Sequence, residues 1–413
     1  MTALLSSLAL LVALLLVFWT QAKVGLKLFG GGNRPNVAKP EARHLAGIDG
    51  LRGILALSVF VHHASCLRNL ALRGAWYPPN AAFAQAGTYA VTLFFFITGF
   101  LFWTKLQNNP RPGIKAHFRS RITRLGPAYW ASAVVILAIV AVLTHGERRE
   151  SWSALAKHVG SWVMFTLPGL DDVNGLAETA RIDARVTWTL RLEWVFYAIV
   201  PFCGWFATKL WRTGLFLVGL VLFGTLLLPQ LASLGHFGRV FSFAQFFMSF
   251  LMAVFSGGIL AAAVRPWLRA KFPVIDFRRP IFSVMGLGLI CCTVLFGHDY
   301  FGVVESLWLI VPFVLIVLGN DWSGFLTSAP AIFLGKISYS IYLMHGIVLF
   351  VTWKVMNRIH PFSEFATPIY WLFIAALGAV VIAVSALWFR CFEAPFMHSA
   401  RSKPAAQPAR APA

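Results

Sequence analysis

Charged residues are scarce in this chain, and acidic residues are the scarcer of the two kinds. Only 12% of the 413 residues are charged, with 15 Asp and Glu against 35 Lys and Arg. Soluble globular proteins carry about 25% charged residues, so the composition excludes a soluble domain of useful size. Instead, 58% of the residues are hydrophobic, and they fall in long apolar runs. These features predict an all-α, polytopic integral membrane helical bundle.

Cysteine is also rare, with five residues in the whole chain. They mostly fall inside or beside apolar runs, without a CxxC pair and without the Cys/His spacing of a metal site. We therefore predict no disulfide, no zinc and no other bound metal.

The excess of basic residues gives a formal net charge of +20, which is high enough to raise the question of nucleic-acid binding. The Lys and Arg residues, however, lie mainly between the apolar runs. Their concentration in the loops of one side of the membrane is the positive-inside pattern. We therefore exclude nucleic acid as a partner and use the basic loops to orient the chain.

Eleven apolar segments are predicted to cross the membrane. The first has no basic residue before it and several after it, which is the opposite of a cleaved signal peptide. The predicted spans are residues 3–19, 47–64, 87–104, 126–144, 187–207, 214–230, 241–264, 281–297, 302–318, 334–353 and 368–389.

These spans divide the chain into four parts. They are an N-terminal transmembrane helix (1–22), a basic linker (23–45), a membrane domain (46–396) and a low-complexity tail (397–413) that we expect to be disordered. The positive-inside rule places the N-terminus outside, with the linker and the C-terminal tail in the cytoplasm.

The second span carries a cation and an imidazole on one stripe. Arg52 and His63 are eleven residues apart, which on an α-helix is about 16 Å along the axis and about 20° around it. His62 points about 100° away from His63. Each ionisable residue at membrane depth costs about 2.5–3.5 kcal/mol, so such residues are candidates for function. The alternative is that Arg52 extends to the surface and the histidines lie in the outer interface.

A carboxylate in the fifth span lies at a depth similar to that of His63. Glu193 is expected about two turns inside the outer surface, where it could orient His63 and raise its basicity. The alternative is a structural ion pair between Arg191 and Glu193.

Two further groups of polar residues fall where a membrane disfavours them. Arg121 and Arg124, spaced i and i+3 in the predicted loop 105–125, present guanidinium forks suited to phosphate; ordinary loop charge is the alternative. His345 lies among Ser and Tyr residues in the tenth span and is a second-rank candidate. The residues alone fit either a proton- or anion-coupled transporter or an enzyme that uses a phosphorylated cytoplasmic donor.

Six segments, in this order, resemble the acyltransferase-3 family of integral membrane O-acyltransferases over about residues 46–396. The segments are LRGILALSVFVHH, AVTLFFFITGFLFW, RSRITRLGP, TWTLRLEWVFY, LGKISYSIYLMH and CFEAPF. Thr98 stands where the family commonly has Ser, and Thr92 where many members have Asp. The resemblance implies a ten-helix core, to which the helix at 3–19 is an addition. Within the family, the chain resembles the stand-alone form, which has no fused hydrolase-like soluble domain.

The resemblance also implies an activity. An acyl group, usually acetyl from cytoplasmic acetyl-CoA, is transferred to a hydroxyl of an extracytoplasmic glycan such as exopolysaccharide or lipopolysaccharide. Succinyl transfer and acylation of an antibiotic or other small-molecule sugar are alternatives within the family. Acyl-CoA is then a donor substrate rather than a permanently bound cofactor, and the protein is expected in the cytoplasmic (inner) membrane.

The family motifs assign roles to particular residues. The opening motif, Arg followed after ten residues by His, selects His63 over His62. Our hypothesis is that Arg121 and Arg124, helped by Arg119, bind the coenzyme A phosphates and that the arm passes Arg52. His63, oriented by Glu193, is then the general base. Secondary candidates are His345, Tyr197, Trp188 and Arg191.

Overall fold

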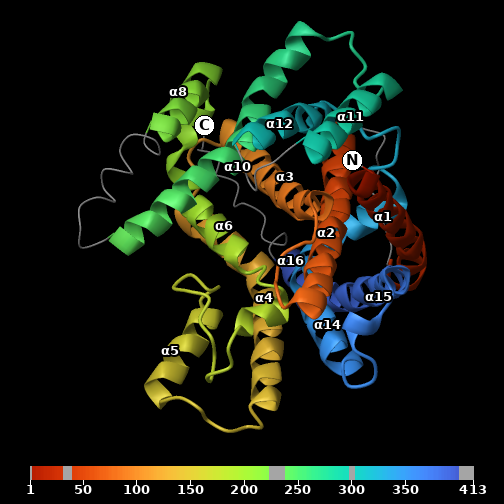
Figure 1. Ribbon diagram of the computed structural model, residues 1–413. Coiled ribbons are helices and arrows are strands. Elements are labelled where there is room, and N and C mark those ends of the chain that lie inside the picture. The colour runs from red at the N-terminus through yellow and green to blue at the C-terminus, as the bar shows by residue number, and fades with distance from the viewer. Residues whose placement is uncertain (1, 31–39, 223–237, 297–302, 400–413) are drawn as a thin grey trace.

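The computed structural model describes residues 2–30, 40–222, 238–296 and 303–399. Within these ranges all regular elements are helical and none is a strand, as Figure 1 shows, which confirms the predicted all-α bundle. Six helices in the described part of the chain are long and apolar enough to cross a membrane. The chain is therefore a multi-pass membrane protein.

The α-helices have the following bounds: α1 Thr2–Phe29, α2 Pro40–Arg73, α3 Ala81–Asn108, α4 Ile114–Leu143, α5 Trp152–Val163, α6 Trp188–Ile199, α7 Gly204–Ala207, α8 Leu210–Leu222, α10 Gly238–Lys271, α11 Pro280–Phe296, α12 Val303–Val317, α13 Ala329–Lys336, α14 Ser338–Met356, α15 Thr367–Trp388 and α16 Ala394–Ser399. Shorter elements are the 3₁₀-helices η1 (Thr179–Asp183) and η2 (Val200–Phe202), and the π-helix η5 (Phe389–Glu393).

Each of the eleven predicted spans overlaps one of these helices, but several boundaries differ. The predicted connection 105–125 between two spans is mostly helical, because α3 continues to Asn108 and α4 begins at Ile114. Hydropathy detects only the apolar part of a helix, so it does not show the polar turns at the end of α3 and the start of α4. No Gly or Pro lies within residues 114–125 to interrupt α4 there. The expected linker (23–45) is helical at both ends; residues 31–39 of it, and residues 400–413 of the expected tail, lie outside the described residues.

Two predicted spans are interrupted. The span at 187–207 breaks after α6 at η2, where Pro201 lacks the N–H that a continuing α-helix would use. The span at 334–353 breaks at Ile337, between α13 and α14. The second break lets α14 begin at Ser338, and its first turns face the interior of the bundle.

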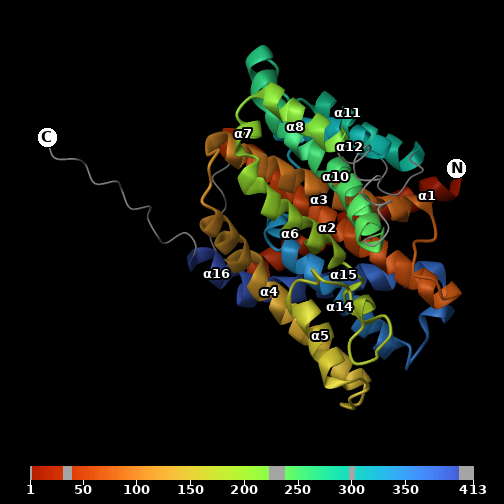
Figure 2. The same ribbon diagram turned by 90° about the vertical axis from the view of Figure 1, so that its left-hand side faces the viewer.

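Glycines bring the helices around the site into direct backbone contact. Helices α2, α3 and α10 lie side by side (Figure 2), and α2 also packs against α13. A Cβ atom added at Gly335 of α13 would lie 1.8 Å from the carbonyl oxygen of Asp49 on α2. A Cβ at Gly258 of α10 would lie 1.9 Å from the carbonyl oxygen of Phe96 on α3. Only glycine permits such close approach, which holds α13 against α2 and α10 against α3.

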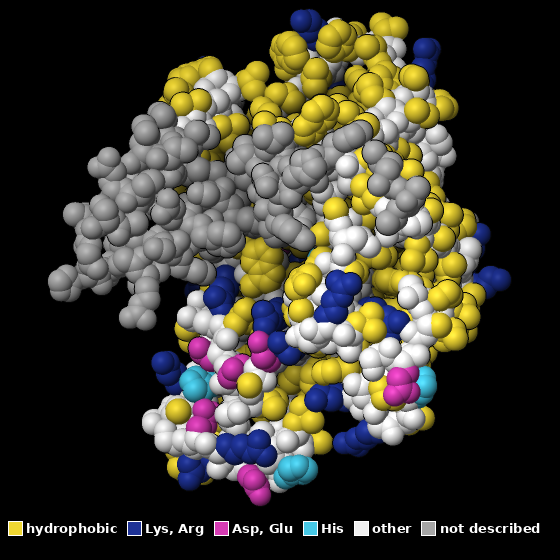
Figure 3. Space-filling view, in the orientation of Figure 1, with side chains coloured by type: hydrophobic (Ala, Val, Ile, Leu, Met, Phe, Trp, Pro, Cys, Tyr) yellow, Lys and Arg dark blue, Asp and Glu magenta, His cyan; other side chains and the backbone are white. Residues whose placement is uncertain are grey.

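The long connection between α4 and α6 is folded rather than extended. It contains α5 and η1, and Asn174 ties it together by bonding the Thr144 hydroxyl at 3.0 Å and the backbone N–H of Arg149 at 2.8 Å. Its η1 segment packs on α14, where a Cβ at Gly346 would lie 2.4 Å from the carbonyl oxygen of Asp183. On the face of the molecule seen in Figure 3, acidic side chains lie in the lower half, and the described residues visible in the upper half are largely hydrophobic.

Candidate functional site

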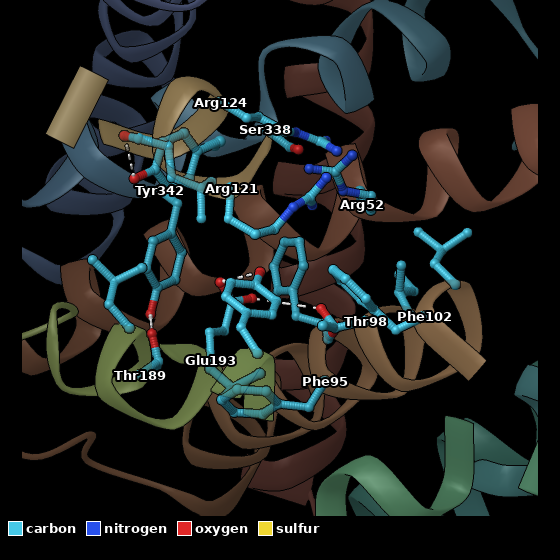
Figure 4. Close-up of a pocket in the computed structure, with 18 residues that line it drawn as sticks. Arg52, Phe95, Thr98, Phe102, Arg121, Arg124, Thr189, Glu193, Ser338 and Tyr342 are labelled. Carbon is cyan, nitrogen blue, oxygen red and sulfur yellow. Dashed lines mark hydrogen bonds between the residues drawn. The ribbon is translucent and has the colours of Figure 1, made fainter. Parts of the chain in front are cut away.

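A cavity of about 890 Å³ opens inside the bundle, and five helices line it: α2, α3, α4, α6 and α14 (Figure 4). One side of the cavity is cationic, with Arg52 from α2 and Arg121 and Arg124 from α4. The remainder is mainly aromatic and aliphatic, with Glu193 from α6 as the acidic side chain of the lining. The cavity therefore joins an anion-binding region to an apolar chamber.

The cationic side combines three kinds of anion donor. In Figure 4, Ser338 lies beside the side chains of Arg52 and Arg124. The Ser338 hydroxyl is buried without a hydrogen-bond partner among the described residues, and Ser338 is the first residue of α14. A helix N-terminus carries a partial positive charge and free N–H groups, so anions bind there readily. Guanidinium groups, a hydroxyl and this helix end together fit a phosphate group.

Arg121 is held in place by aromatic rings. Its guanidinium carbon lies 5.1 Å from the ring centre of Phe102 and 5.9 Å from that of Tyr197. Its Nη2 also donates to the hydroxyl of Ser120 at 3.2 Å. Arg119, predicted to help bind phosphate, is exposed and does not line the cavity. Since α4 turns 100° per residue, Arg121 and Arg124 face inward while Arg119 does not.

Glu193 accepts two hydrogen bonds inside the cavity. The Tyr197 hydroxyl donates to Oε2 at 3.0 Å, and the Thr98 hydroxyl donates to Oε1 at 3.5 Å. The three cavity arginines also act on Glu193 electrostatically. The alternative of an Arg191–Glu193 ion pair does not form among the described residues. Arg191 lies outside the cavity lining, and its Nε and Nη2 atoms are buried without a partner there.

His63 lies outside this cavity, and its closest polar partner is another histidine. Its Nδ1 is 3.0 Å from Nε2 of His345, and its ring stacks on Trp76 with 6.2 Å between ring centres. The expectation that Glu193 orients His63 is therefore wrong, because the bonds of Glu193 go to Tyr197 and Thr98. The prediction rests on the similar depth of the two residues, and depth along a helix does not determine which neighbour a side chain faces.

The histidine pair nevertheless lies close to the apolar end of the cavity. On α14, His345 follows the cavity residue Tyr342 by three residues, and the two ring centres are 6.1 Å apart. On α3, Gly87 contacts His62, the neighbour of His63 in the sequence. Gly87 lies four residues before Val91, which lines the cavity. Three to four residues make one helical turn, about 5 Å. His63 and His345 therefore lie about one turn beyond the cavity, at the end opposite the arginines.

His62 occupies a packed position that differs from that of His63. Its Nδ1 is 2.8 Å from the carbonyl oxygen of Phe83, and a Cβ added at Gly87 would lie 2.4 Å from its ring. Both contacts hold the start of α3 against α2. These contacts account for His62 as a structural residue.

The other predicted residues have different positions. Tyr197 lines the cavity, whereas Trp188 is half-buried against the main apolar core. Sequence reasoning missed Glu393, which is buried in η5 and accepts a hydrogen bond from the Ser340 hydroxyl of α14. An acid inside an apolar segment was the available signal. Among the described residues, no three His, Cys, Asp or Glu side chains are grouped as metal ligands.

Comparison with known proteins agrees with these features. The chain is 24% identical over 386 residues to a Staphylococcus aureus (strain COL) protein named "Putative O-acetyltransferase SACOL0978", covering 86% of this chain and 57% of the relative. It is 22% identical over 333 residues to the O-acetyltransferase OatA of S. aureus (strain NCTC 8325 / PS 47), covering 75% of this chain and 51% of the relative. The chain thus spans little more than half the length of these curated relatives. No solved structure matches it.

The family comparison covers most of the chain. The family model described as "Acyltransferase domain" matches residues 45–388, which include every residue that lines the cavity and both histidines of the pair. The predicted resemblance is therefore confirmed, and the chain belongs to the acyltransferase-3 family.

Proposed function

We propose that this protein is an O-acetyltransferase that moves an acetyl group from cytoplasmic acetyl-CoA to a hydroxyl of an extracytoplasmic glycan. The observation that carries the proposal is the arrangement along α2, where Arg52 lines the cationic side of a cavity and His63 lies beyond its opposite end. The names of the relatives support acetyl as the acyl group. The charged cavity would also fit a transporter, but membership of an acyltransferase family favours the enzyme.

The donor would bind by its phosphates at the cationic side. Arg121 and Arg124 provide forked donors, and Ser338 adds its unpartnered hydroxyl. The eleven residues from Arg52 to His63 correspond to about 16 Å on a helix. Coenzyme A carries its thioester at the end of a long, thin arm, so a donor held by its phosphates can place the thioester near His63. Acetyl, succinyl and other short acyl groups fit this arrangement equally, and only the relatives' names favour acetyl.

The reaction at His63 is a simple acyl transfer. His63 accepts the proton of the acceptor hydroxyl while the hydroxyl oxygen attacks the thioester carbonyl carbon. The carbon–sulfur bond then breaks, and the proton on His63 passes to the leaving sulfur. The products are the acetyl ester and coenzyme A, with atoms and charge balanced. A transient acyl-His63 is the alternative route to the same products.

The acceptor and the membrane orientation belong to the same proposal. The basic loops favour a cytoplasmic donor side in the cytoplasmic (inner) membrane, with the N-terminus outside and the C-terminus inside. The folded connection between α4 and α6 would then face outward, beside the histidine pair, because its η1 segment packs against Gly346. A surface glycan such as exopolysaccharide or lipopolysaccharide would approach from that side.

The test uses the full chain in inside-out membrane vesicles with [acetyl-¹⁴C]acetyl-CoA. Surface polysaccharide extracted from a strain that lacks this protein is enclosed in the vesicle lumen, which is the extracytoplasmic side, and serves as the acceptor. We expect alkali-labile label in the polysaccharide, reduced by about 10²–10⁴-fold in His63→Ala, because a positioned general base contributes a factor of that size. His62→Asn, whose amide can replace the bond to Phe83, is the matched control. Label that crosses the membrane without ester formation would contradict the proposal and favour transport.

A further inference from the structure

The histidine pair is anchored at one end by a backbone carbonyl. Nδ1 of His345 is 2.9 Å from the carbonyl oxygen of Ile341, four residues earlier on α14. Nε2 of the same ring is 3.0 Å from Nδ1 of His63 on α2. The Ile341 carbonyl, the His345 ring and the His63 ring are therefore linked in series by two hydrogen bonds. This series connects α14 to α2.

The chemistry of these groups determines where the hydrogens lie. A carbonyl oxygen only accepts, so Nδ1 of His345 must carry the hydrogen of that bond. A neutral imidazole has one N–H, and Nε2 of His345 is therefore an acceptor. The bond to His63 then requires a hydrogen on Nδ1 of His63. In the neutral ring this leaves Nε2 of His63 with its lone pair free.

We propose that His345 is a positioning residue that holds His63 in the Nδ1–H tautomer, so that Nε2 of His63 is the nitrogen that accepts the proton of the acceptor hydroxyl. The proposal rests on the function proposed above, in which His63 is the base. Free histidine side chains in water favour the opposite, Nε2–H tautomer. The partner of Nδ1 thus decides which nitrogen is the base.

The surroundings of the pair support this role. The His345 side chain is fully buried, with 0% of its surface exposed, so water has no access to take its place as the acceptor. The His63 ring is partly exposed, which leaves room for a substrate. The rings of His345 and Trp76 are nearly parallel to that of His63, at 26° and 19°. A ring held by a hydrogen bond and two flat neighbours has little freedom to turn over.

The proton movements follow from this tautomer. The acceptor hydroxyl gives its proton to Nε2 of His63, and the ring becomes an imidazolium with hydrogens on both nitrogens. The Nε2 proton then goes to the sulfur of the leaving coenzyme A. The Nδ1 hydrogen stays between His63 and His345 throughout, so His345 neither gains nor loses a proton. This differs from a relay, in which a second proton would move.

The tautomer is measured directly by ¹⁵N solid-state NMR of the full chain in proteoliposomes, with all 11 histidines labelled. The signals that disappear in His63→Asn are those of His63. We expect a protonated Nδ1 and an unprotonated Nε2 for His63 in the wild type. In His345→Leu we expect the share of the Nε2–H form of His63 to rise, with the backbone carbonyl of Val59 as the remaining hydrogen-bond partner of the ring. A wild-type His63 that already carries its hydrogen on Nε2 would overturn the proposal.

Activity provides a second readout, with the extracted polysaccharide and acetyl-CoA as substrates. His345→Leu should lower kcat by about 10–100-fold, with both KM values changed by less than about twofold, as expected for loss of a group that orients a catalytic residue. His345→Gln, whose amide oxygen can accept from Nδ1, should recover kcat to within about fivefold of the wild type. Equal loss in the Leu and Gln variants, or unchanged kcat in both, would overturn the role of His345.

The two proposals fail in different ways. If His63→Ala keeps its activity, the base role of His63 is wrong, whatever the NMR result. If His63→Ala is inactive but the tautomer of His63 does not depend on His345, only the present inference is wrong. The wild-type spectrum and the Gln variant test it even where the Leu variant does not fold.

Discussion

The hydroxyl of Tyr197 donates a hydrogen bond of 3.0 Å to Oε2 of Glu193, one turn earlier on α6. The same ring lies 5.9 Å from the guanidinium carbon of Arg121. Tyr197 thus contacts the acid of the cavity with its hydroxyl and one of the cavity cations with its ring face. The two contacts are separable by mutation.

Tyr197→Phe should remove the hydrogen bond and keep the ring contact with Arg121. We expect kcat/KM for acetyl transfer to fall about tenfold, because a hydrogen bond to a charged group contributes about 1.5–3 kcal/mol and part of it is replaced by Thr98 and by water. Tyr197→Leu should lose both contacts and fall further. The kinetics of the two variants, measured side by side, check this order, and equal losses would contradict it.

Arg124→Ala should raise the KM for acetyl-CoA about tenfold or more, since Arg124 lines the cationic side of the cavity. Arg119→Ala removes the same charge from the same helix, but at an exposed position outside the cavity. It should change this KM by less than about twofold. Initial rates at varied acetyl-CoA concentration distinguish the two variants. If both raise the KM alike, general loop charge binds the donor and the cavity assignment is wrong.

Gly335→Ala should destabilise the protein by more than about 2 kcal/mol, because its Cβ would lie 1.8 Å from the carbonyl oxygen of Asp49 and would push α13 away from α2. Gly47→Ala, on α2, is the matched control, since no heavy atom lies within 4 Å of its added Cβ. Alanine is the better helix former, so this control should be neutral or slightly stabilising. Thermal unfolding in detergent, followed with a thiol-reactive dye, measures the change in stability of each variant relative to the wild type.

Asp183 should make stability depend on pH. Burial raises the pKa of its carboxyl from 3.8 to about 7; its Oδ1 accepts from the Arg185 N–H at 2.9 Å, and its Oδ2 has no partner among the described residues. The native state then holds a proton that the unfolded chain releases from about pH 4 upward. The free energy of unfolding should therefore fall as pH rises from about 4 to about 7 and level off above, by up to about 4 kcal/mol.

The measurement compares thermal unfolding between pH 5 and pH 8. Asp183→Asn should remove most of the decline, because its amide does not ionise. Asp276→Asn is the control at an exposed carboxyl, where bonding to Arg278 lowers the pKa instead, and it should leave the decline in place. A decline that persists unchanged in Asp183→Asn would show that another group causes it.

Sequence reasoning was most successful where the signal is local. Hydropathy located helix at all eleven predicted spans, and the i, i+3 spacing of Arg121 and Arg124 brought both into one cavity. It failed where the outcome depends on contacts between distant segments. His63 and His345 are 282 positions apart, and nothing within either helix indicates their contact. The break at Ile337, which gives α14 an N-terminus of its own, likewise has no Pro or Gly at the break itself.

The π-helix between α15 and α16 has a consequence for the register of the last helical segment. A π-helical turn takes in one residue more than an α-helical turn, and each residue of an α-helix turns the chain by about 100°. Glu393 ends this segment, and in this register its carboxylate accepts the hydrogen bond from Ser340 on α14. A change of side chain at the exposed Cys391 should leave the direction of the Glu393 carboxylate unchanged. Loss of one residue there would turn the carboxylate away from α14, so in this segment the length of the chain matters more than the identity of its exposed residues.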